Sequence, residues 1–358
     1  MKSIRVIMNT SRSIAAFCAV ALIITLGIAF PKAVHADRPG GKQDLVFFGD
    51  SLSDTGNRYF DEGSMNTPPY ELAAAENLIP SLPYAIGGPT FTNGQPWVEY
   101  VARAIGRGGV SQAALRSNGI AANYAYAGAR ASNAFPLPPN TNRNLGDQVV
   151  QYIADAGPEG ISADTLHIIF IGGNDIGGAI FIASAVQDSE LREQLVNMVL
   201  QNAIESVFEN ALTLAGSGAQ RFLFLTTPNA GYIPAFGGDL GAIFLGGQLA
   251  SFFNCAIVGV TPTFDCPLLP LGTPTVAGVL TGVFGAEVAV FDTKSLLDDM
   301  IADPENYGLS NTSDHCIKPF EPPYRCDAPD EYLYWDNIHP TAKVHEIIGN
   351  AVIDALSN

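Results

Sequence analysis

Residues 45–57 read LVFFGDSLSDTGN, an apolar run that ends in a glycine, an aspartate and a serine and continues into small polar residues. An uninterrupted apolar run of this length is typical of a parallel strand that is buried on both faces. The run therefore predicts a strand that delivers the hydroxyl group of Ser51 to its carboxyl end, the edge where open α/β sheets bind ligands. Gly-Asp-Ser also occurs in ordinary turns, so its interpretation depends on the rest of the chain.

Two internal segments combine small residues with a polar group in a similar way. Gly128 lies within NYAYAGARA at 123–131, where the neighbouring alanines would let a backbone N–H approach a ligand. Asn174 follows a second apolar run, LHIIFIGG at 166–173. Each also has a plainer interpretation, because an asparagine after glycines is common in turns and helix caps, and a glycine alone indicates only a turned or crowded backbone.

The segment WDNIHPT at 335–341 places Asp336 three residues before His339. A serine hydroxyl needs a neighbouring base to act as a nucleophile, and that base needs a partner that fixes its tautomer. His339 Nε2 can accept the proton of Ser51 while Asp336 orients the Nδ1–H group. Pro340 favours a loop here, just before a helix.

An attacked ester carbonyl oxygen gains negative charge, so hydrogen-bond donors must already point at its position. The candidates are the backbone N–H groups of Ser51 and Gly128 and the side-chain amide of Asn174. Asp54 and Asn57 have no such role in this interpretation; we expect Asx-type bonds from them to hold the loop after Ser51.

In their order and local context, these segments resemble the GDSL or SGNH hydrolase family of esterases and lipases, from Leu45 to about Leu356. The chain is most similar to the secreted branch with bacterial phospholipase and haemolysin relatives and the large plant GDSL lipases. The resemblance implies an α/β fold of three α/β/α layers, flavodoxin-like, with a mainly parallel central sheet and long loop insertions. It also implies the site residues: Ser51 as nucleophile, Asp336 and His339 completing the triad, and Ser51, Gly128 and Asn174 in the oxyanion hole.

The pattern of elements is consistent with that fold. Apolar runs predict strands at 45–48, 166–171, 221–225 and 288–291, and helical periodicity is clearest at 190–214 and 342–356. Strands that alternate with helices indicate a parallel sheet with helices on both faces.

Two insertions, 66–100 and 228–285, are rich in aromatic and other apolar side chains. The first contains FTNGQPWVEY, which resembles the segment after the nucleophile in the same family. Its aromatic residues Phe91, Trp97 and Tyr100 are candidate substrate contacts. The alternative, which we favour for most of the apolar side chains in these insertions, is that they pack on the core.

The first 36 residues predict a signal peptide: basic residues at Lys2, Arg5 and Arg12, an apolar stretch over 14–30, and the small-residue sequence VHA at 34–36. We therefore expect an exported protein whose residues 37–358 form a single hydrolase domain. The destination is the periplasm, the cell surface or the medium.

Charge argues against several classes of partner. The chain has 18 Lys and Arg against 35 Asp and Glu, a net charge of −17, which disfavours tight binding to nucleic acid or to anionic membranes. The uncharged run 241–260 is long enough to span a bilayer, but Gln248 and Asn254 favour a buried helix and no stable membrane insertion. The sequence carries no signal for the number of subunits.

Cys18 lies in the predicted signal peptide, which leaves an even number of cysteines in an exported chain and predicts two disulfides. Three pairings are possible; pairing Cys255 with Cys266 and Cys316 with Cys326 is favoured because each closes a short local loop. A zinc site would need more closely spaced ligands. We expect neither a metal nor an organic cofactor.

The sequence thus predicts a secreted serine ester hydrolase that forms an acyl-enzyme on Ser51 and acts on small-molecule esters, favouring lipid or lipid-like ones. A carbohydrate acetylesterase and a lipid acyltransferase are alternatives, because the same triad serves all three reactions. From another class, a secreted binding protein could keep the fold without turnover, although each catalytic position is present.

Overall fold

The structure is a computed structural model, and it describes residues 45–62, 89–116, 121–134, 143–259, 266, 273–317 and 324–357. The predicted signal peptide and most of the first insertion lie outside these ranges.

The centre of the fold is a parallel sheet of four strands, and it confirms the strands and the fold class predicted from the sequence. The strands lie side by side in chain order, with Leu45 paired to Leu166, Leu166 to Arg221 and Arg221 to Glu287. All residues of the first two strands are buried, as their uninterrupted apolar sequences require. The strands are β1 (Leu45–Gly49), β2 (Leu166–Phe170), β3 (Arg221–Leu225) and β4 (Glu287–Phe291).

A fifth segment extends the sheet beyond β1. Phe47 donates its N–H to the carbonyl of Ala122 at 2.9 Å and accepts from Tyr124 N–H at 2.8 Å, while Tyr126 N–H donates to Gly49 at 3.0 Å. The segment 122–126 therefore runs parallel to β1 on its outer side. Counting it, the spatial order in chain numbering is 2-1-3-4-5, the flavodoxin-like order.

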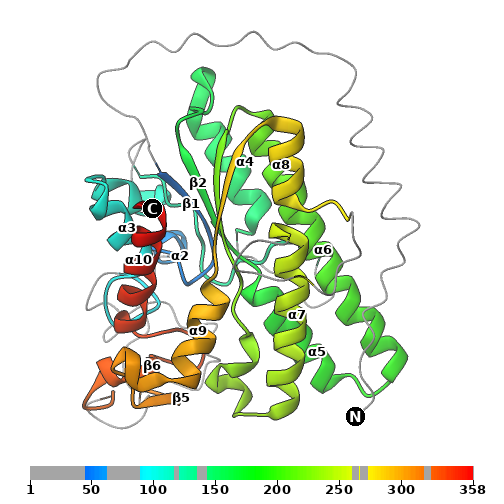
Figure 1. Cartoon of the computed structure of the whole chain (residues 1–358), viewed down its shortest axis with the longest axis vertical. Helices are drawn as coiled ribbons and strands as arrows, with labels where there is room; N and C mark the ends of the chain where they lie inside the picture. Colours follow the sequence, from blue (N-terminus) through cyan, green and yellow to red (C-terminus); the bar gives the residue numbers. More distant parts are fainter. Residues whose placement is uncertain are drawn as a thin grey trace.

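Helices cover both faces of the sheet (Figure 1). On one face α3 (Trp97–Ala104) packs against α10 (Ala342–Ser357). The other face carries α4 (Leu145–Ala156), α6 (Ser189–Gly216), α7 (Leu240–Val258) and α8 (Val276–Phe284). The remaining elements are α2 (Asn57–Glu62), α5 (Gly173–Ala185), α9 (Thr293–Ala302), the small parallel sheet of β5 (Asn311–His315) and β6 (Tyr332–Tyr334), and the 3₁₀ turns Gly108–Ser111, Ala114–Arg116, Gly157–Glu159, Ala230–Tyr232, Pro234–Phe236, Pro304–Tyr307 and Pro329–Glu331.

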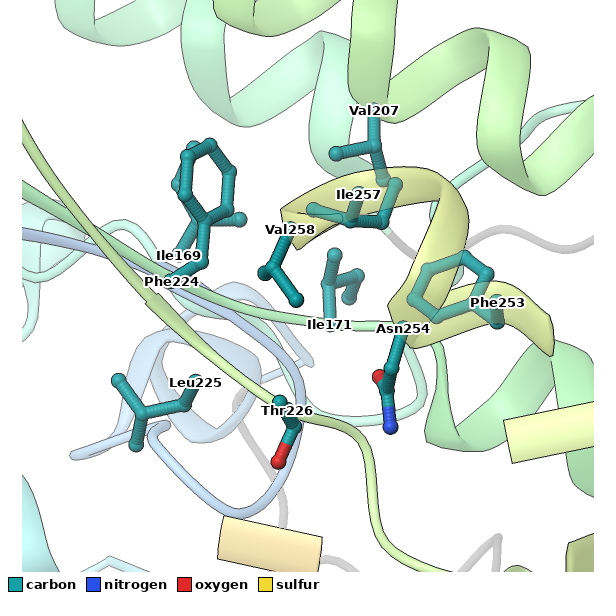
Figure 2. A pocket seen from close by; sticks show the side chains of 10 residues that line it. All are labelled: Ile169, Ile171, Val207, Phe224, Leu225, Thr226, Phe253, Asn254, Ile257 and Val258. Carbon is teal, nitrogen blue, oxygen red and sulfur yellow. The ribbon is translucent and has the colours of Figure 1, made fainter. Parts of the chain in front are cut away.

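Among the described residues, α7 is the helix that is long and apolar enough to cross a membrane, but half of its most apolar stretch is buried in the fold. Phe253, Asn254 and Val258 face the sheet (Figure 2). Together with side chains of the sheet they line a cavity of about 10 Å³, which is too small for an acyl chain. The buried helix predicted here holds for this carboxyl-terminal half, whereas Leu240 and Phe244, near the start, are 80% and 63% exposed.

Two disulfides join Cys255 to Cys266 and Cys316 to Cys326, the pairing favoured from the short loops. The first joins the last turn of α7, which contains Cys255, to Cys266. The second lies beside β5 and β6, where Cys316 donates its N–H to the carbonyl of Tyr334 at 3.0 Å. β6 leads directly into the segment that contains Asp336 and His339.

Candidate active site

Ser51, His339 and Asp336 form a continuous chain of hydrogen bonds at the carboxyl end of β1. Ser51 Oγ lies 2.8 Å from His339 Nε2, and His339 Nδ1 lies 2.8 Å from Asp336 Oδ2. Because a carboxylate only accepts, Nδ1 is the protonated nitrogen and Nε2 is left to accept from the serine hydroxyl. The histidine and the aspartate are buried, and the serine is half-buried.

The loop before α10 is shaped by Asp336 itself. Its Oδ1 accepts the backbone N–H groups of Ile338 at 2.8 Å and His339 at 2.7 Å. These bonds form an Asx-type turn, which brings the His339 imidazole close to the Asp336 carboxylate. The structure thus has a loop at the position where Pro340 predicted one. The same carboxylate both builds the turn and orients the ring.

Electrostatics keep this carboxylate ionised. Burial raises the pKa of Asp336, but the charge of His339 and the hydrogen bonds from His339 and Ile338 outweigh it, so the pKa lies below its usual value. An ionised Asp336 stabilises the imidazolium that forms when His339 takes a proton.

Residues 91–93 contact the loop that contains His339 through one ring contact and two hydrogen bonds. The ring of Phe91 lies against that of His339, with centroids 5.2 Å apart. Thr92 Oγ donates to the carbonyl of Pro340 at 2.9 Å, and Asn93 Oδ1 accepts the N–H of Ala342 at 2.7 Å. Sequence reasoning did not assign a role to Thr92 or Asn93, since their partners lie almost 250 residues away.

The other two aromatic candidates are differently placed. Trp97 is only 1% exposed, and its ring meets Phe47 edge to face at a centroid distance of 5.9 Å. Its Nε1–H donates to Ser53 Oγ at 3.1 Å. Tyr100 packs on Gly349, where a Cβ atom would lie 2.8 Å from the tyrosine Cβ. Trp97 is therefore a packing residue, the alternative stated above. Tyr100 is half-buried against α10, and Phe91 is the candidate that contacts His339.

Gly128 occupies the third position of a tight turn from Tyr126 to Ala129, closed by the N–H of Ala129 on the carbonyl of Tyr126 at 2.9 Å. Its φ is +77°, the value that a type II turn requires at this position and that glycine adopts without strain.

Asn174 lies in the first turn of α5, directly after β2. Its Nδ2 donates to the carbonyl of Ala129 at 2.8 Å, which connects α5 to the Gly128 turn. An amide nitrogen carries two hydrogens, so this bond fixes the direction of the second one. The partial positive charge of the helix N-terminus adds to the attraction for an anion here.

The tight entry into α5 depends on Gly172. It has a φ of +114°, and a Cβ atom there would meet the ring of Phe253 at 2.7 Å. A glycine is therefore needed to let Asn174 follow β2 so closely.

Two further buried carboxyl groups lie close to these residues. Burial raises the pKa of Asp50 to about 6 and that of Asp175 to about 7. Asp175 Oδ2 accepts the N–H of Ala131 at 2.8 Å, while its Oδ1 is buried without a hydrogen-bond partner. The raised pKa and the unpartnered Oδ1 favour the neutral acid at Asp175 below about pH 7. Within the described ranges, no group of three His, Cys, Asp or Glu side chains is arranged to hold a metal ion.

Comparison with known proteins points to one family. The family described as GDSL-like Lipase/Acylhydrolase matches residues 45–352. The chain is 26% identical to GDSL esterase/lipase EXL4 of Arabidopsis thaliana, covering 95% of this chain and 98% of that protein. It is 21% identical to the thermolabile hemolysin of Vibrio parahaemolyticus, covering 90% of this chain and 66% of that protein.

Among solved structures, LAE5, an alpha/beta hydrolase enzyme from the metagenome of Lake Arreo, Spain, is 15% identical and aligns over 88% of this chain and 96% of its own with a TM-score of 0.38, too low to inform the fold. The family match spans most of the chain and includes Ser51, Gly128, Asn174, Asp336 and His339. The chain belongs to the GDSL-like lipase/acylhydrolase family.

Proposed function

We propose that this chain is a secreted serine esterase that cleaves lipid or lipid-like esters through an acyl-enzyme on Ser51. Family membership makes it a carboxylic ester hydrolase. The single observation that carries the assignment of residues is the hydrogen-bond chain from Ser51 through His339 to Asp336, with both links at 2.8 Å.

In the proposed reaction, His339 Nε2 accepts the Ser51 proton as Oγ attacks the ester carbonyl carbon. Negative charge moves to the carbonyl oxygen, where the N–H groups of Ser51 and Gly128 and the Asn174 amide stabilise it. When the tetrahedral intermediate collapses, the C–O bond to the alcohol breaks and the alcohol leaves with the proton from His339. Water, activated by the same histidine, then attacks the acyl-enzyme and releases the carboxylic acid.

The preference for lipid-like esters is supported by exposed apolar side chains on α5, the helix whose first turn contains Asn174, and on α7. After Asp175, α5 carries no charged residue, and Phe181 on this helix is 54% exposed. Leu240 and Phe244 of α7, which packs against α5, are exposed as well. An ester with a long acyl chain would cover part of this apolar surface, at about 0.8 kcal/mol for each methylene buried.

Export is supported by two features. The two disulfides are typical of proteins that fold in an oxidising compartment. The basic and apolar leader over residues 1–36 is typical of a signal peptide.

The test is hydrolysis of p-nitrophenyl esters from acetate to palmitate by the mature protein, by Ser51→Ala and by a matched control, Ser357→Ala. Ser357 lies in the last turn of α10, where its hydroxyl donates to the carbonyl of Ile353. We expect Ser51→Ala to abolish turnover, Ser357→Ala to leave it unchanged, and the wild-type rate to rise with acyl length.

Turnover by folded Ser51→Ala would contradict the assignment of the nucleophile. Activity confined to acetate would favour a carbohydrate acetylesterase, and Ser51-dependent transfer to an added alcohol in preference to water would favour an acyltransferase. A folded wild-type protein that is inactive on every ester of the series would favour the binding protein.

A further inference from the structure

Asp54 lies three residues after Ser51, is completely buried and takes no part in the proposed chemistry. Its Oδ1 accepts the N–H groups of Gly56 at 2.7 Å and Asn57 at 2.6 Å. These are the local Asx-type bonds predicted from the sequence, and they fix the loop that leads from Ser51 into α2.

The second carboxylate oxygen has a distant partner. Asp54 Oδ2 accepts the N–H of Arg58 at 3.2 Å and that of Ala127 at 2.9 Å, the latter 73 residues away in the chain. Ala127 immediately precedes Gly128 in the turn closed between Tyr126 and Ala129. One buried carboxylate thus bonds both to the nucleophile loop and to the turn that contains Gly128.

The turn is held on both sides of Gly128. On one side Asp54 accepts the N–H of Ala127, and on the other the carbonyl of Ala129 accepts the Asn174 amide. Of the other buried links, that from the Asn57 amide to the carbonyls of Asn123 and Ala125 ends before the turn begins. Arg58 Nη1 reaches the carbonyl of Ala127 only at 3.5 Å.

We propose that Asp54 is a positioning residue for the oxyanion hole: its two oxygens hold the Ser51 loop and the Gly128 turn in a fixed relation, so that their N–H groups converge on one oxygen atom. The assignment rests on the proposed function. It requires a carboxylate, because only this group accepts on both oxygens. An asparagine of the same size has one accepting oxygen, which can bond to the N–H groups of the loop or to that of Ala127 in the turn. Its NH₂ group then faces the N–H donors on the other side and cannot accept from them.

The experiment compares wild type, Asp54→Asn and Asp188→Asn at pH 8, where Asp54, with a pKa raised to about 6 by burial, is ionised. Asp188 is a matched control because its carboxylate also accepts two backbone N–H groups, those of Glu190 and Leu191, at the start of α6. The measurements are kcat and KM for p-nitrophenyl butyrate and the inhibition constant of an alkyl boronic acid, which forms a tetrahedral adduct with a catalytic serine.

For Asp54→Asn we expect kcat to fall by roughly tenfold to a hundredfold, less than the loss for complete removal of a donor. KM should stay within about twofold, since oxyanion contacts strengthen only as the transition state forms. Inhibition by the boronic acid should weaken by the same factor as kcat, a correlation that a merely structural role would not produce. Asp188→Asn should match wild type in all three measurements.

Asp54→Ser is a second variant, to be used if Asp54→Asn does not fold. The serine hydroxyl can still accept from the N–H groups of the loop, but the side chain is too short to reach Ala127. A folded Asp54 variant with wild-type kcat and boronic acid affinity, or one that changes only KM, would overturn this assignment alone. Wild-type hydrolysis that survives Ser51→Ala would overturn the proposed function and this assignment with it.

Discussion

Replacement of Asn174 by alanine tests the oxyanion hole most directly. The substitution removes the amide that lies at the start of α5 and donates to the carbonyl of Ala129 at 2.8 Å. We expect kcat to fall by about a hundredfold to a thousandfold, or about 2.7 to 4 kcal/mol of transition-state stabilisation, the usual cost of losing one donor. KM should change little, because the lost contact matters only once the oxyanion develops.

The structural part of the loss can be separated from the catalytic part. Losing the bond to Ala129 should lower the free energy of unfolding by about 0.5 to 1.5 kcal/mol. Asn202 is the matched control, because its amide also donates to a backbone carbonyl, that of Ala134, at 2.8 Å. Asn202→Ala should therefore lose similar stability but keep its kcat.

The assay is steady-state hydrolysis of p-nitrophenyl butyrate at 25 °C, with urea denaturation of each variant to measure its stability. A folded Asn174→Ala variant whose kcat falls by less than about tenfold, or by no more than that of Asn202→Ala, would refute the role of Asn174 as an oxyanion donor.

Three other predictions concern stability and specificity. Replacing Cys316 and Cys326 together by serine opens a loop of sequence separation 10, and the free energy of unfolding measured in urea should fall by about 2.7 kcal/mol; an unchanged value would contradict this. Asp175, with a folded-state pKa of about 7 against 3.8 unfolded, adds stability that is complete below about pH 4 and is lost as pH rises through 7. Asp175→Asn cannot titrate, so its stability relative to wild type should rise by about 2 to 3 kcal/mol between pH 5 and pH 8, and a constant difference would show that Asp175 is ionised throughout. Phe181→Ser should lower kcat/KM for the palmitate ester by roughly tenfold and leave acetate unchanged, as expected if a long chain covers the ring; equal effects on both esters would indicate a general disturbance of α5.

The strands and the pairing of Asp336 with His339 could be predicted because their signals are local. An apolar run such as 45–48 reports burial on both faces directly, and the short spacing of Asp336 and His339 is visible in the sequence. The segment 122–126 was not predicted as part of the sheet, because its short sequence ANYAY is interrupted by Asn123 and has no continuous apolar run. Its place is set by backbone bonds to β1, and any residue other than proline can make such bonds.

Hydrogen bonds between distant segments could not be predicted either, because they depend on where the chain returns in the completed fold. The local bonds of Asp54 follow from its turn preference, but its bond to Ala127 depends on where the chain returns 73 residues later. The same holds for Thr92 and Pro340, which are 248 residues apart. No periodicity or spacing encodes these pairs, since each is a consequence of the completed sheet.

These long-range bonds explain how a site made from loops can be precise. The proposed catalytic groups come from four separate segments of the chain, and the Ser51 and His339 side chains that meet at 2.8 Å are separated by 288 residues. The sheet fixes the strand ends, but a displacement of about 1 Å in a loop is enough to cost a hundredfold in rate. Side chains that bond one loop to another, at Thr92, Asn93 and Asp54, remove that freedom. Because each such bond is modest in energy, substitutions at these positions should reduce kcat far more than they reduce stability.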